Sequence, residues 1–126
     1  MSEPVWLDKR AVLVFHNETL AQHGGPSGVR DEGLLESALA RARNAYPYGE
    51  EDLCALASLY VHGVVKNHPF VDGNKRTGFL CGALFLELNR LRFEGPEPEV
   101  VAMTLALASG EADEKAYAEW LRAWTS

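Results

Sequence analysis

The stretch "HPFVDGNKRTG", residues 68–78, holds the densest group of chemically useful side chains in this sequence. An imidazole, a carboxylate, an amide, two cations and two glycines fall within eleven positions. His68 carries a group that titrates near neutral pH and can therefore accept a proton. Asp72 supplies one carboxylate, and Mg²⁺ is commonly held by one such carboxylate together with substrate phosphates.

The same stretch has the features of an anion site. Gly73 tolerates a positive φ angle, which lets the backbone N–H groups around Gly73 and Asn74 converge on an anion. A helix that starts here adds unpaired N–H donors and partial positive charge. Lys75 and Arg76 add full charges, although cations at this end of a helix are unfavourable for stability. Together these groups predict phosphoryl or nucleotidyl transfer.

A purely structural explanation of each residue stays open at this point. His68 can end a helix, Asp72 can cap the next one, and the two cations can be solvated charges in its first turn. A P-loop is rejected, because Phe79 and Leu80 stand where Lys and Ser/Thr are required and no strand precedes the glycines.

Apolar sequence with helical periodicity lies on both sides of the stretch. It predicts one helix over residues 52–67 and another over 74–89, the second apolar on most of its surface and therefore buried. Pro69 disfavours the helical conformation in His68, so the first helix must stop there. Phe70 is expected to anchor the connecting loop in the core.

Other segments complete an all-α prediction, a compact bundle of about six helices in a single domain over residues 1–126. "NAYPYGEE", residues 44–51, is expected to form an ordered turn or short hairpin. The remaining helices are expected over residues 7–22, from a cap at Asp31 onward, and over 98–108 and 113–124.

Composition excludes several classes of protein. Net charge is −6, with 18 acidic against 12 basic residues, which argues against direct binding of nucleic acid. Cys54 and Cys81 lie in apolar runs without a metal-binding pattern, so we expect buried, reduced thiols. The N-terminal apolar run is too interrupted for a signal peptide, and "FLCGALFLEL" is shorter than the roughly 20 residues that span a bilayer. We therefore expect a cytoplasmic protein without a membrane partner.

The motif "HPFVDGNKRTG" resembles the signature of the Fic/Doc superfamily, and specifically of its death-on-curing (Doc) branch. "GVRDEGLLESAL", "YPYGEEDL" and "LELNRLRFEG" are similar to the same branch, so the resemblance covers about residues 24–95. It implies an all-α fold of about six helices with the motif between two central ones. It also implies transfer of part of a nucleoside triphosphate to a protein hydroxyl.

The resemblance assigns a role to each polar residue of the motif. His68 would be the general base that deprotonates the target hydroxyl, and Asp72 would be the Mg²⁺ ligand. ATP would be the cofactor, bound through Gly73, Asn74, Lys75 and Arg76. Residues 44–51 match the flap that clamps the target chain by strand-like contacts.

Two positions depart from the AMP-transferring members of the superfamily. Lys75 replaces a second glycine, and its side chain occupies space that would otherwise be open to phosphates on one side of the anion site. Phe79 replaces a second arginine. In the Doc branch these two replacements accompany a nucleotide that is bound in the opposite orientation, and the γ-phosphate is transferred. The expected enzyme is therefore a protein Ser/Thr phosphotransferase, with an AMP transferase as the second choice. A catalytically inactive nucleotide-binding module is a further alternative, against which the intact motif argues.

Regulation is expected to come from a separate protein. The sequence has no match to the inhibitory S/T-x-x-x-E-G/N motif of Fic proteins, which favours inhibition in trans by a Phd-type antitoxin. The chain would then be a growth-arresting toxin, and the family's known target is translation elongation factor Tu. An RNase toxin is disfavoured by the acidic surplus. Of the remaining polar residues, Arg30 is expected at most to brace a loop, His62 to be packed, and His16 and His23 have no sequence partners.

Overall fold

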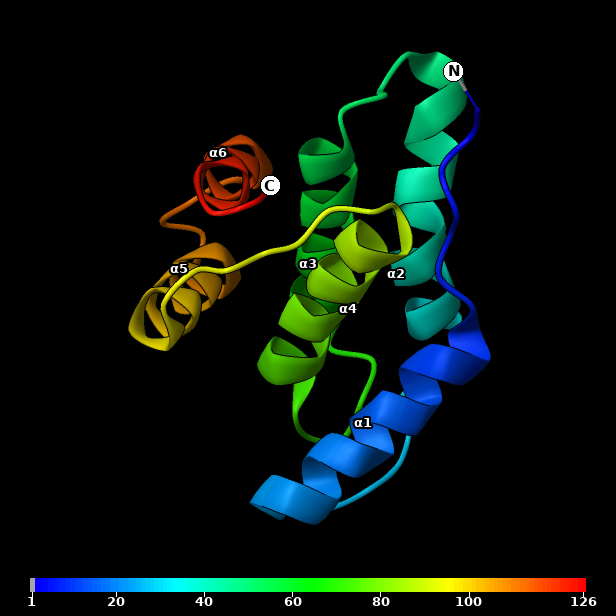
Figure 1. Ribbon diagram of the computed structural model, residues 1–126. Coiled ribbons are helices and arrows are strands. Elements are labelled where there is room, and N and C mark those ends of the chain that lie inside the picture. Colours follow the sequence, from blue (N-terminus) through cyan, green and yellow to red (C-terminus); the bar gives the residue numbers. More distant parts are fainter. Residues whose placement is uncertain (1) are drawn as a thin grey trace.

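The computed structural model, which describes residues 2–126, contains six α-helices and a short 3₁₀ turn. The helices are α1 (Lys9–His23), α2 (Glu32–Ala45), α3 (Leu53–Asn67), α4 (Asn74–Leu88), α5 (Glu97–Ser109) and α6 (Glu114–Ala123), and the turn is η1 (Tyr46–Tyr48). The central pair, α3 and α4, has α2 on one side and α5 and α6 on the other, while α1 crosses the lower end (Figure 1). The all-α prediction is confirmed, with helix bounds that agree within two residues.

Most helices begin at an aspartate whose carboxylate accepts a hydrogen bond from a backbone N–H group of the first turn. These caps are Asp8, Asp31, Asp52 and Asp113. Each such cap stabilises a helix by about 1 kcal/mol. In contrast, α4 begins after Gly73 with no side-chain cap. The first turn of α4 therefore keeps N–H groups available for a ligand.

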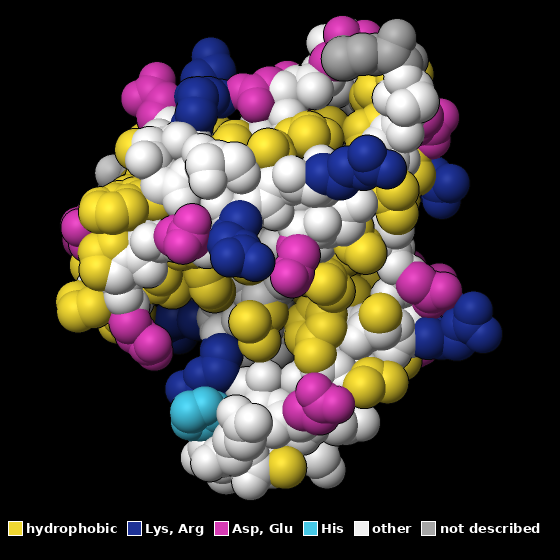
Figure 2. All heavy atoms as spheres, in the orientation of Figure 1, with side chains coloured by type: hydrophobic (Ala, Val, Ile, Leu, Met, Phe, Trp, Pro, Cys, Tyr) yellow, Lys and Arg dark blue, Asp and Glu magenta, His cyan; other side chains and the backbone are white. Residues whose placement is uncertain are grey.

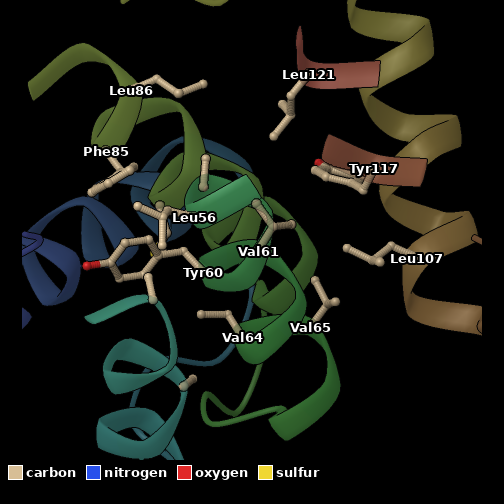
Figure 3. Packing of buried hydrophobic residues seen from close by; sticks show 14 of the residues in the cluster. Leu56, Tyr60, Val61, Val64, Val65, Phe85, Leu86, Leu107, Tyr117 and Leu121 are labelled. Carbon is tan, nitrogen blue, oxygen red and sulfur yellow. The ribbon is translucent and has the colours of Figure 1, made fainter. Parts of the chain in front are cut away.

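The hydrophobic core is built around α3 (Figure 3). Side chains from this helix face those of α4 on one side and those of α5 and α6 on the other. The core residues that Figure 3 labels are Leu56, Tyr60, Val61, Val64 and Val65 of α3, with Phe85, Leu86, Leu107, Tyr117 and Leu121 from the other helices. Burial of one such side chain stabilises the fold by about 1.5–3 kcal/mol.

Close helix contacts fix the two ends of the loop between α3 and α4. A Cβ atom placed on Gly63 of α3 would lie 3.0 Å from the carbonyl oxygen of Ala38 in α2. A Cβ atom placed on Gly82 of α4 would lie 2.6 Å from a methyl group of Val61 in α3. The three helices thus pack at a separation that larger residues would increase, so the helix ends that carry the loop are held in place.

Two expectations about these elements are wrong. The sequence predicts that α4 is buried on most of its surface, but Phe79 and Leu80 are only half-buried because they line a cavity between α1, α4 and α5. The ordered turn at residues 44–51 is confirmed as η1, but its interpretation as a flap is not. It precedes α3 whereas the motif follows it, and the 15 residues of this helix put about 22 Å between them (Figure 1).

The expected burial of the two cysteines is confirmed by the structure. Cys54 and Cys81 are free and buried, and burial raises the pKa of both thiols. Within residues 2–126, every helix is too short or too polar to cross a membrane. A single domain over residues 1–126 stays a prediction, and Met1 lies outside the described residues.

Candidate functional site

The loop between α3 and α4, residues 68–73, is called the motif loop below. It starts at His68, whose left-handed conformation (φ 53°, ψ 53°) ends α3, in agreement with the predicted effect of Pro69. The N–H group of His68 donates to the carbonyl oxygen of Val64 at 3.0 Å, and the side chain is exposed. The turn therefore presents the imidazole to solvent while its backbone stays part of the helix end.

Arg30 binds the carbonyl group of His68, the other polar group of this residue's backbone. Its guanidinium donates from Nε to the carbonyl oxygen of His68 at 2.8 Å and from Nη2 to that of Asn67 at 3.0 Å. The backbone N–H groups of Arg30 and Asp31 donate to the carbonyl oxygen of Pro69 at 2.7 and 3.0 Å. These bonds satisfy the carbonyl groups of residues 67–69, and they confirm the expectation that Arg30 braces a loop.

Residues 24–31, the bracing segment, run antiparallel to the motif loop. Val29 and Phe70 form a β-bridge, and the N–H group of Val71 donates to the carbonyl oxygen of Gly28 at 3.1 Å. A Cβ atom on Gly25 would lie 2.4 Å from an oxygen of the Asp72 carboxylate. The segment that makes strand-like contacts at this site is therefore the bracing segment. The sequence predicts such contacts for residues 44–51 instead.

Phe70 anchors the motif loop in the core, as predicted, and its side chain is fully buried. The side-chain amide of Asn74 pairs with both of its backbone groups. Asn74 Oδ1 accepts from the Phe70 N–H group and Asn74 Nδ2 donates to the Phe70 carbonyl oxygen, each at 2.9 Å. The Asn74 side chain is therefore committed to the loop itself, and only its backbone N–H group is left to meet a ligand.

The sequence prediction missed His16, which lies on α1 and is 2% exposed. Its Nε2 atom is 2.9 Å from the carbonyl oxygen of Asp72, and its ring stacks on Phe70 with centroids 3.8 Å apart. His16 and Asp72 are 56 residues apart in the sequence. The only local signal is a periodic one, because His16 falls on the same face of α1 as the buried Val12 and Leu20.

The other histidines lie outside the motif loop. His62 is half-buried on α3, where its Nδ1 atom accepts from Arg41 at 2.8 Å and lies 3.1 Å from a carboxylate oxygen of Glu114. Burial lowers the pKa of His62 despite this carboxylate, which agrees with a neutral ring that accepts from Arg41. The expectation that His62 is packed is confirmed. His23 is exposed at the end of α1.

The start of α4 has the geometry of an anion site. Gly73 adopts the left-handed conformation that the sequence predicts, with φ 78° and ψ 18°. Within residues 2–126, the backbone N–H groups of Asn74, Lys75 and Arg76 have no hydrogen-bond acceptor. The side chains of Lys75 and Arg76 are exposed beside them. Unpaired N–H groups, the helix dipole and two cations all favour an anion in this position.

A magnesium ion would fit this site only together with phosphates. One oxygen of the Asp72 carboxylate accepts from the Gly73 N–H group at 2.8 Å, and lone pairs on both oxygens remain for a metal. Among the described residues, no group of three or more His, Cys, Asp or Glu side chains could hold an ion by itself. A single carboxylate beside an anion site is the donor set that Mg²⁺ uses when substrate phosphates complete its coordination.

A cavity of about 590 Å³ adjoins the start of α4. Figure 2 shows basic side chains and a histidine close together between α1 and α4. Hydrophobic side chains are exposed over α5 in the same view. The lining residues include Lys75, Arg76, Phe79 and Leu80 of α4, His23 of α1, and Val101 and Leu105 of α5. This cavity, called the α1–α4–α5 groove below, is basic at one end and mostly apolar along α5, which also contributes Glu97.

Comparison with known proteins matches the elements that build this site. The model of the Fic/DOC family matches residues 6–86, which include α1 to α3, the motif loop and most of α4. The chain is also 41% identical over 87 residues to a protein named Toxin Doc from Mycolicibacterium smegmatis. That match covers 67% of this chain and 64% of the relative, so the chain spans less than two thirds of the relative's length.

Substitution of Asn74 tests whether its amide holds the motif loop. Asn74→Ala leaves the buried N–H and carbonyl groups of Phe70 without partners, which should lower the free energy of unfolding by about 2–4 kcal/mol. The measurement is urea denaturation followed by circular dichroism. Asn17→Ala, at an exposed position of α1, is the matched control and should change stability by less than about 0.5 kcal/mol. Equal small effects of the two substitutions would contradict the clamp.

Proposed function

The chain belongs to the Fic/DOC family, in its death-on-curing branch, and we propose that it transfers the γ-phosphate of ATP to a hydroxyl group of a target protein. The observation that carries this proposal is the uncapped start of α4, where unpaired backbone N–H groups lie within a few residues of an exposed imidazole and a single carboxylate. Phosphoryl transfer needs little more than positioning and charge stabilisation from the protein.

His68 is the proposed general base. Both polar groups of its backbone are hydrogen-bonded, to Val64 and to Arg30, whereas its imidazole has no partner among the described residues. The unprotonated ring nitrogen is therefore free to take the proton of an incoming hydroxyl group. A positioned base of this kind contributes about 10²–10⁴ to the rate.

The phosphates are proposed to lie on the first turn of α4. The N–H groups of Asn74, Lys75 and Arg76 would donate to phosphate oxygens, and the Lys75 and Arg76 side chains would balance their charge. Asp72 would hold Mg²⁺, which neutralises phosphate charge when it is bound. Because these groups are fixed by the motif loop and the helix, little reorganisation is needed when the nucleotide binds.

The surroundings of Lys75 support transfer of phosphate over transfer of AMP. Phe79 lies one turn further along α4, and its ring packs edge-on against Phe93 with centroids 5.4 Å apart. At position 79, where AMP-transferring relatives carry an arginine, the side chain is therefore apolar and itself offers phosphates no donor. Such a site favours the nucleotide orientation in which the terminal phosphate meets the hydroxyl group.

Intact-protein mass spectrometry distinguishes the possible reactions. Translation elongation factor Tu is the candidate target, and incubation with the protein, ATP and Mg²⁺ should add one phosphoryl group to it. His68→Ala should keep the fold, because its exposed ring makes no internal bond, and should slow transfer by about 10²–10⁴. Addition of AMP would contradict the proposed orientation. Nucleotide binding without modification of any target would indicate that the protein is a catalytically inactive nucleotide-binding module.

We further propose that a Phd-type antitoxin inhibits the protein in trans and covers the α1–α4–α5 groove. Two apolar side chains of α5 are exposed along this groove, Val101 (53%) and Leu105 (48%). Exposed apolar side chains that border a basic site fit an amphipathic helix with acidic residues on its polar side. A helix in this position would also reach the start of α4, where the phosphates are proposed to bind.

Growth of a bacterial host tests this partner. Expression of the chain alone should arrest growth, and co-expression of the small neighbouring gene should relieve the arrest. Leu105→Asp should retain the arrest but lose the relief, because a charge in the groove opposes apolar docking. Val14→Asp, at a 57% exposed position of α1 outside the groove, is the control and should be relieved normally. Unimpaired growth with abundant, folded, unmutated protein would count against the toxin proposal.

A further inference from the structure

We propose that His16 is a positioning residue for Asp72, and that its hydrogen bond to the motif loop sets how well the protein binds nucleotide in the presence of Mg²⁺. This inference rests on the proposed role of Asp72 as the Mg²⁺ ligand. His16 itself lies on α1, outside the motif, and is not among the groups proposed to bind the nucleotide or the metal.

The hydrogen bond defines the state of the His16 ring. The carbonyl oxygen of Asp72 can only accept, so the Nε2 atom of His16, 2.9 Å away, must carry the hydrogen. The ring is 2% exposed, so solvent offers its Nε2–H group little alternative to this bond. Replacement of His16 by a side chain without a donor therefore removes this hydrogen bond.

The ring is also held in one position. On one face it stacks on Phe70, with centroids 3.8 Å apart and an angle of 14° between the planes. A Cβ atom placed on Gly73 would lie 3.7 Å from His16 Nε2, so the ring also lies next to residue 73. Phe70 is immobilised in turn by the amide of Asn74. His16 thus contacts the motif loop at Phe70 and Asp72.

The peptide unit between Asp72 and Gly73 connects His16 to the carboxylate. Its carbonyl oxygen is bonded to His16, and its N–H group donates to Oδ1 of the Asp72 side chain at 2.8 Å. A rotation of this peptide unit would therefore carry the carboxylate with it. Gly73 follows directly, and glycine resists such a rotation less than any other residue.

The other hydrogen bonds of the motif loop do not restrain this peptide unit. The bracing segment binds the backbone of residues 67–71, and Asn74 binds Phe70. Within residues 2–126, His16 provides the one hydrogen bond to the carbonyl group of Asp72. Loss of that bond should leave the loop folded but release the carboxylate from its present orientation.

The consequence is specific to the metal. A carboxylate in the wrong orientation weakens binding of the Mg²⁺–nucleotide complex, whereas the N–H groups of α4 still bind phosphate without Mg²⁺. Groups that orient a metal ligand typically contribute about 10–100-fold to metal affinity. A residue that only supports the fold would instead weaken nucleotide binding to the same extent with and without Mg²⁺.

Two substitutions at His16 separate the hydrogen bond from the packing. His16→Phe keeps a ring against Phe70 but removes the donor, and His16→Gln keeps an N–H donor of similar reach but removes the ring. The dissociation constant of a non-hydrolysable ATP analogue is measured by calorimetry with Mg²⁺ and with EDTA. We expect His16→Phe to weaken binding about 10–100-fold with Mg²⁺ and less than about twofold with EDTA, while His16→Gln stays within about threefold of the unaltered protein.

Each result decides between the possibilities. Equal losses in Mg²⁺ and EDTA, or no loss in Mg²⁺, would overturn the positioning role while the proposed function stands. If Mg²⁺ does not strengthen binding by the unaltered protein, the proposed metal site fails and this inference fails with it. Should His16→Phe not fold, ¹⁵N NMR of the unaltered protein takes its place. A His16 proton on Nε2, with a resonance that moves with Mg²⁺ and analogue but not with analogue in EDTA, supports the inference, and a proton on Nδ1 overturns it.

Discussion

The site depends on the two hydrogen bonds through which the Asn74 amide holds both backbone groups of Phe70. Because Phe70 is fully buried, these bonds tie the motif loop to the core at its midpoint and to the first residue of α4 at its end. The residues of the motif then divide by direction. Phe70 and Asn74 face inward and build the loop, while His68 and Asp72 are exposed and available for chemistry. This division explains why so many residue types are needed within so short a stretch.

The same stretch contains several features that are locally unfavourable. His68 holds a left-handed conformation that costs a residue with a side chain about 1–3 kcal/mol. The first turn of α4 has no side-chain cap and carries two cations near the positive end of the helix dipole. The capped helices, the α3 core and Arg30 hold these features in place. Such costs are expected where binding rather than stability determines the residues.

The helices, the Asp31 cap and the buried Phe70 could be predicted because each depends on residues that are close in the sequence. Helical periodicity, Asp31 and Pro69 act within one or two turns. His16 and Arg30 could not be placed in the same way, because their partners lie 56 and 37–38 residues away. The flap assignment failed for a physical reason: the helix predicted over residues 52–67 already separates residues 44–51 from the motif. Its length alone is about 22 Å, too long for contact with the motif loop.

The central claim is that the motif loop presents a preformed site for the terminal phosphate of ATP. A crystal structure with Mg²⁺ and a non-hydrolysable ATP analogue tests it most directly. We expect γ-phosphate oxygens on the backbone N–H groups of residues 74–76, Mg²⁺ between the phosphates and Asp72, and the His68 ring facing the γ-phosphorus. The α-phosphate in that position, or a nucleotide bound away from the start of α4, would contradict this account.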